Sequence, residues 1–229
     1  MKQLGNIVWW LLLPVTAIIA VWITLRNLDA FALRTDTGYL TTVGGIGQAA
    51  WFRAGFFLHV FTAIPVVLLG WSQFSRWLQQ KHSRWHRGIG KVYVGLVLFG
   101  AAPGGLVLAM GAAGGWLGKV CFVIMSLLWG FFTLRAWLRI RERNIHGHQA
   151  DMQRSYALSF AAISLRIWMF LIGGLLAWRT PEAYALCAWL CWVPNLVLLE
   201  IWRKIKNGQL IMNYECVRHM YGWAVARKK

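Results

Sequence analysis

Long runs of apolar residues alternate with short basic connections along most of the chain. A helix needs about 20 apolar residues to cross the hydrocarbon core of a bilayer. Six runs meet this requirement and predict membrane-spanning helices over 7–25, 54–74, 88–110, 116–137, 155–178 and 183–202. The expected fold class is therefore all-α, an integral membrane helical bundle over 1–206 followed by a basic tail over 207–229.

The composition supports lipid as the solvent of this chain. Of the 229 residues, 59% are hydrophobic and only 14% are charged, whereas soluble proteins have about a quarter charged residues. The net charge of +17 would suggest nucleic acid as a partner of a soluble protein. Here the basic residues cluster between apolar runs, as the positive-inside rule predicts. We therefore expect a multi-pass protein of a bacterial inner membrane that binds no nucleic acid.

The basic residues also predict an orientation. Lys2 and the segments 76–91, 135–154 and 203–229 hold one, five, five and seven Lys or Arg, eighteen in all, against five on the other side. This distribution predicts six spans with both termini in the cytoplasm. The basic tail is suited to lie along the anionic inner leaflet as an interfacial helix.

Arg166 is the clearest polar residue inside a predicted span. It lies eleven residues into the fifth run, near the expected midplane, on one helical stripe with Ser155 and Ser159. An arginine facing lipid at this depth costs at least about 2.5–3.5 kcal/mol, so Arg166 is expected to face the bundle interior. Both a structural role, bonding backbone carbonyls, and a role as counter-charge to an anionic ligand remain open.

Histidines mark two further helix faces. His59 lies inside the second run, on a stripe with Gln73. A lone intramembrane histidine is often a packed hydrogen-bonding residue, but this stripe also suits the lining of a cavity. His86 begins the third run on a face with three glycines, which let another helix or a flat cofactor come close. Of His146 and His148, at most one can point into the same site.

These residues form three groups with a recognisable order. They are His59 with Gly70 and Gln73-Phe74; His86-Arg87-x-x-Gly90 with Tyr93; and His148-x-x-x-Met152-x-Arg154-Ser155-Tyr156-Ala157 followed by Arg166. Over residues 55–170 the chain thereby resembles the DUF2306 family of membrane proteins. It departs from the family at Asp151, where an aromatic residue is usual. The resemblance implies a polytopic membrane fold and no particular activity.

One b-type haem is the sharpest functional hypothesis. Two imidazoles from different helices can hold haem iron, and arginines can pair with the propionates. His86 and His148 both lie at the expected cytoplasmic boundary, with Arg87 and Arg154 nearby for the propionates. His59 lies on the other side with no second histidine at its depth. A two-haem relay within one chain is therefore not expected, and electron transfer would need a partner subunit.

Three other functions remain open, and with them the question of whether the chain is an enzyme. His59, Gln73 and Arg166 would line the midplane cavity of a small-molecule transporter or binding protein, although no internal repeat is evident. A metal-dependent enzyme would need carboxylates near the cytoplasmic histidines. The available ones are Glu142, Asp151, Glu200 and Glu215. The polar residues would be structural in an accessory or assembly subunit, and the small-residue stripes would also suit a homo-oligomer.

Overall fold

The computed structural model describes residues 39–178 and 180–208, and this part of the chain is helical without strands. The elements are α3 (Tyr39–Thr42), η1 (Gly44–Gln48), α4 (Ala50–Ser72), α5 (Arg76–Lys81), α6 (Ser83–Leu96), η2 (Val97–Ala101), α7 (Ala102–Ala109), α8 (Gly115–Arg141), α9 (Ile145–Ser159), α10 (Ala161–Trp168), η3 (Met169–Leu175), α11 (Pro181–Leu190) and a helix over 193–208. The predicted run 7–25 and the tail residues 209–229 lie outside the described residues.

Five continuous helical units of the described chain are long and apolar enough to cross a membrane. They are Ala50–Ser72, Ser83–Ala109, Gly115–Arg141, Ile145–Leu175 and Pro181–Gly208. The predicted helical membrane class is thus confirmed. Four of these units continue beyond the apolar runs into basic turns, because residues such as arginine and glutamine remain good helix formers once the helix leaves the hydrocarbon.

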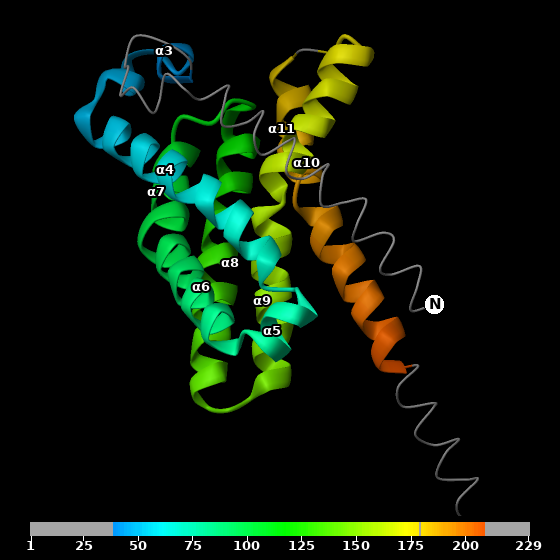
Figure 1. Cartoon of the computed structure of the whole chain (residues 1–229). Coiled ribbons are helices and arrows are strands. Elements are labelled where there is room, and N and C mark those ends of the chain that lie inside the picture. The colour runs from blue at the N-terminus through cyan, green and yellow to red at the C-terminus, as the bar shows by residue number, and fades with distance from the viewer. Residues whose placement is uncertain (1–38, 179, 209–229) are drawn as a thin grey trace, which may run out of the picture.

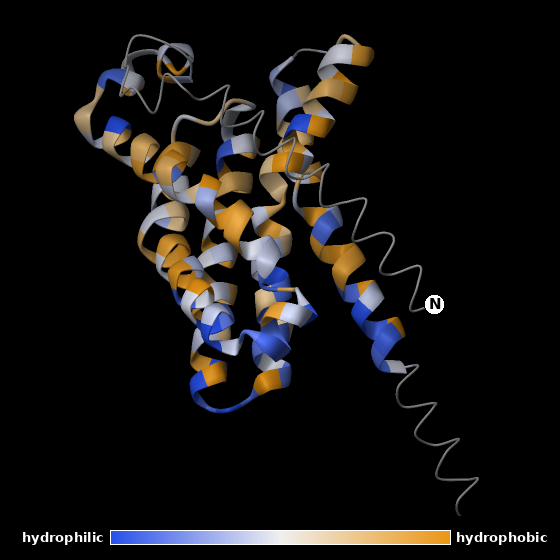
Figure 2. Cartoon of the chain, in the orientation of Figure 1, coloured by the Kyte–Doolittle hydropathy of each residue, from blue (hydrophilic) through white to orange (hydrophobic). Residues whose placement is uncertain are grey.

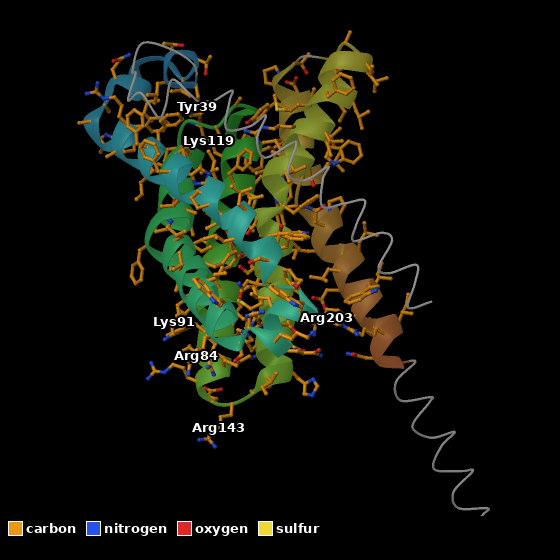
Figure 3. All side chains as sticks on the ribbon, in the orientation of Figure 1. Tyr39, Arg84, Lys91, Lys119, Arg143 and Arg203 are labelled. Carbon is orange, nitrogen blue, oxygen red and sulfur yellow. The ribbon has the colours of Figure 1, made fainter. Side chains whose placement is uncertain are left out.

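The helices form a bundle (Figure 1), and basic side chains gather at one of its ends (Figure 3). Figure 3 labels Arg84, Lys91, Arg143 and Arg203 toward this basic end, and Tyr39 and Lys119 at the opposite end. α6 and α9 both run away from the basic end, whereas α4 and α8 run back toward it. Colouring by hydropathy shows hydrophilic residues gathered at the basic end and apolar residues over the middle of the bundle (Figure 2).

Much of the bundle surface is apolar. Only 28–50% of the most apolar part of each spanning helix is buried inside the protein. Large side chains such as Phe99 (81% exposed), Phe170 (62%) and Leu198 (66%) point outward. A water-facing surface of this kind would be costly, while in a bilayer lipid tails cover it.

Prolines accompany two of the places where the long helices deviate. Pro103 has no N–H for the carbonyl four residues before it, and the preceding turn widens into the π-helical η2, in which the Ala102 N–H donates to Val97 O. Pro194 accompanies the break at 191–192, between α11 and the helix over 193–208. The helix over 193–208 leans away from the bundle in Figure 1.

Candidate functional site

His86 and His148 lie at the same level near the basic end. The Tyr93 hydroxyl of α6 and the Ser155 hydroxyl of α9 are 2.9 Å apart. His86 precedes Tyr93 by seven residues, and His148 precedes Ser155 by seven, which is two turns along the same face of each helix. The two imidazoles are close enough to interact electrostatically. The fold thus brings together the two histidines considered above as a ligand pair.

The hydrogen bonds of the two rings differ. His148 Nδ1 lies 2.9 Å from Ala136 O. Because a carbonyl only accepts, this contact assigns the proton to Nδ1 and leaves the Nε2 lone pair available. His86 Nδ1 is buried and has no hydrogen-bond partner among the described residues. An unsatisfied buried polar atom costs about 1–3 kcal/mol, which a bound group could offset.

A buried layer of hydroxyl groups lies beyond the two histidines toward the middle of the bundle. Tyr93 Oη lies 2.9 Å from Ser155 Oγ and 3.0 Å from Ser159 Oγ. Thr133 of α8 adds a 2.7 Å contact to Ser155 Oγ and donates to Trp129 O at 2.7 Å. These hydrogen bonds connect α6, α8 and α9 and fix their register at the level above the histidines.

Asp151 is the centre of a cluster of arginines at the basic end. It is fully buried, and its carboxylate lies 2.6–2.8 Å from guanidinium nitrogens of Arg135, Arg139 and Arg154. Arg154 also forms a bidentate pair with Glu200, at 2.6 and 3.0 Å. Arg154, considered above as a propionate partner, therefore already pairs with two carboxylates. Arg87 is exposed and close enough to act electrostatically on His86.

His59 and Arg166 lie together in the other half of the bundle, while Gln73 does not join them. Tyr156 Oη donates to Val67 O at 3.3 Å, which sets the register of the antiparallel α4 and α9. His59 and Arg166 are close enough to interact electrostatically. A methyl group added to Gly90 would come within 3.1 Å of Gln73 Oε1, so Gln73 lies beside α6, one turn from His86.

The carboxylates needed for a metal-dependent enzyme are engaged elsewhere. Asp151 and Glu200 both pair with arginine, and Glu142 is exposed. Glu215 lies outside the described residues. Within 39–178 and 180–208, no group of three or more His, Cys, Asp or Glu side chains is arranged to hold a metal ion.

Several residues that shape these sites did not stand out in the sequence. Asn195 donates to Cys191 O at 2.8 Å and to Ser164 Oγ at 3.1 Å, which ties α11 and the helix after it to α10. Tyr184 lies near Arg166. Among these features, only the arginine cluster had a signal in the sequence. Asp151 stands where the family usually has an aromatic residue, and it lies in a segment with several arginines.

Together, the fold and the clustered polar residues define a polytopic helical membrane protein with histidines and arginines inside the bundle. The chain belongs to the family described as "Predicted membrane protein (DUF2306)", whose model matches residues 56–203. No curated protein and no solved structure matches the chain. The family description gives the membrane class and no activity, so a function has to be argued from the residues.

Proposed function

We propose that the chain is a membrane redox protein that binds one b-type haem through His86 and His148. The observation that carries this proposal is the placement of both imidazoles at one level, on two parallel helices whose register is set by Tyr93 and Ser155. The carbonyl-bound Nδ1 of His148 leaves Nε2 available, as in many histidine ligands. The buried Nδ1 of His86 has no partner among the described residues, and contact with a bound group could satisfy it.

The number of ligands favours haem over a bare metal ion. Structural and catalytic zinc sites use three or four protein ligands, and the described residues contain no group of three. Haem iron takes four nitrogens from the porphyrin and needs only two from the protein. A pair of histidines is therefore a sufficient protein contribution for haem alone.

Arg87 is the better partner for a haem propionate. Arg154 is held by Asp151 and Glu200, whereas Arg87 is exposed and next to His86. Propionates at the basic end would lie where the helices leave the hydrocarbon, so their charges would stay near water. When bound, the group would supply one-electron chemistry, and the histidines would hold it near one membrane face.

A single haem on one side requires an external electron donor or acceptor. The sequence has six histidines, and His59 is the one placed in the other half of the described bundle. The proposal therefore includes an electron-transfer partner subunit or a soluble redox partner at the basic end. On the positive-inside rule this end faces the cytoplasm of a bacterial cell, which reporter fusions in the basic turns would test.

The test is the absorption spectrum of the protein purified from haem-replete cells. We expect a Soret band, a haem content near one per chain, and loss of both in His86→Ala and in His148→Ala. His146→Ala is the matched control, because His146 is two residues from His148 but exposed. A colourless, folded protein, or a Soret band that survives in both ligand variants, would refute the proposal.

A further inference from the structure

A second site lies in the half of the bundle away from the basic end. The antiparallel helices α4 and α9 are in register at Val67 and Tyr156. Eight residues from this level, backward along α4 and forward past the turn at Phe160 into α10, lie His59 and Ser164, and Ser164 is two residues before Arg166. The electrostatic interaction between His59 and Arg166 agrees with this register. Two basic side chains therefore come together inside the spanning part of the bundle.

The charge of Arg166 is not neutralised by any carboxylate of residues 39–178 and 180–208. Its Nη1 donates to Ala162 O of its own helix at 2.6 Å, and the ion pairs of the described chain involve other residues. A guanidinium has five N–H donors in a planar fork that matches a carboxylate. Because an intramembrane arginine is costly unless it is paired, this fork indicates an anionic ligand.

His59 is held in a fixed orientation beside this charge. Its Nδ1 lies 2.7 Å from Ala101 O, at the end of η2. Gly104 packs against it so closely that a Cβ there would be 2.7 Å from His59 N. With Nδ1–H donating to this carbonyl, Nε2 keeps its lone pair and can only accept a hydrogen bond, so His59 flanks the guanidinium of Arg166 and leaves the anion to it.

Both residues of the pair are next to π-helical segments, which often occur at functional sites. η2 (Val97–Ala101) supplies the carbonyl that holds His59. η3 (Met169–Leu175) begins three residues after Arg166. Two independent distortions of spanning helices therefore lie at one pair of basic side chains.

We propose that Arg166, beside His59, binds the carboxylate headgroup of a single-chain amphiphile that reaches the site from the lipid. One arginine balances one negative charge, and its fork allows two parallel hydrogen bonds to a carboxylate. The chain of the ligand has apolar surface to follow, because Ile167, Met169 and Phe170 are 45%, 44% and 62% exposed. The site is separate from the histidine pair at the basic end and does not depend on haem.

The test is saturation binding of radiolabelled dodecanoate to the protein in a nonionic detergent. We expect displacement by unlabelled dodecanoate but not by dodecanol, which has the same chain without the charge. Arg166→Gln should weaken binding about tenfold or more, because charge-assisted hydrogen bonds are lost. Arg84→Gln is the matched control, since Arg84 is exposed at the basic end, and it should bind as the unaltered protein does.

Three results would overturn the proposal. They are no saturable binding of dodecanoate to the unaltered protein, equal displacement by dodecanol, and unchanged affinity in Arg166→Gln. Displacement of labelled dodecanoate by phosphatidylglycerol at a much lower concentration than by unlabelled dodecanoate would assign the site to a lipid phosphate instead of a carboxylate. If Arg166→Gln does not fold, Arg166→Lys can replace it, because lysine keeps the charge and removes the planar guanidinium. The comparison of dodecanoate with dodecanol uses the unaltered protein and needs no variant.

Discussion

Asp151→Ala tests how the basic end of the bundle is held together. The fully buried carboxylate joins α8, through Arg135 and Arg139, to Arg154 of its own helix α9. Arg154 in turn binds Glu200 in the helix over 193–208. Removing the Asp151 carboxylate leaves three guanidinium groups close together, with the Glu200 carboxylate beside Arg154 left to offset their charge.

The expected cost lies between those of a buried and an exposed ion pair. Removing one partner of a buried pair costs about 3–5 kcal/mol, and an exposed pair is worth about 0–1 kcal/mol. The three arginine side chains are 20–33% exposed and can turn toward water or lipid headgroups. We therefore expect Asp151→Ala to lower the free energy of unfolding by about 2–3 kcal/mol.

The assay is equilibrium unfolding in mixed micelles, with Glu142→Ala as the control. Glu142 is an exposed carboxylate at the same end, so its loss should change stability by less than about 0.5 kcal/mol. In a double-mutant cycle, Arg139→Ala should cost less in the Asp151→Ala background than in the unaltered protein. If Asp151→Ala unfolds like Glu142→Ala, the cluster does not stabilise the bundle and this reasoning is wrong.

Two further predictions concern packing within the bundle. Tyr93→Phe removes a hydroxyl with two buried partners, at 2.9 and 3.0 Å. It should lower the free energy of unfolding by about 1–2 kcal/mol. Tyr156→Phe loses one hydrogen bond of 3.3 Å and should cost less in the same unfolding assay. Gly104→Ala places a methyl group 2.7 Å from backbone and should lower the thermal midpoint at a cost of about 1–3 kcal/mol. Gly88→Ala, with nothing within 4 Å, should leave it unchanged or raise it, and equal midpoints for the two glycine variants would contradict the close packing of α4 and α7.

The hydrophobic pattern predicted the described helices because a helix that spans a bilayer must have a certain length of apolar residues. It did not predict their true ends, since α8 and α9 continue into the arginine-rich turn, where helix-forming residues and tertiary contacts such as Asp151 with Arg135 stabilise the helix. The stripe of Arg166 also predicted burial: Ser155 and Ser159 share its inward face and are 0% and 2% exposed.

The candidate sites were less predictable because they depend on register between helices. Sequence spacing placed His86 and His148 near one membrane face, but only the bond between Tyr93 and Ser155 shows that they share a level. Gln73 lies on the expected inward stripe with His59, yet along α4 it faces Gly90 instead of Arg166. A one-dimensional pattern gives the inward face of a helix and leaves open which neighbour it meets.

The wide turn of η2 has a consequence for that register. It holds one residue more than an α-helical turn, as the bond from Ala102 N–H to Val97 O shows. Each residue of a helix turns it by about 100°, so the extra one sets which side of α7 faces α4. With α7 rotated in this way, Gly104 faces His59. If the same residues were wound as a regular α-helix, α7 would be rotated by about 100° and Gly104 would no longer face the histidine, so a regular helix of this sequence would fit the bundle less well than the distorted one.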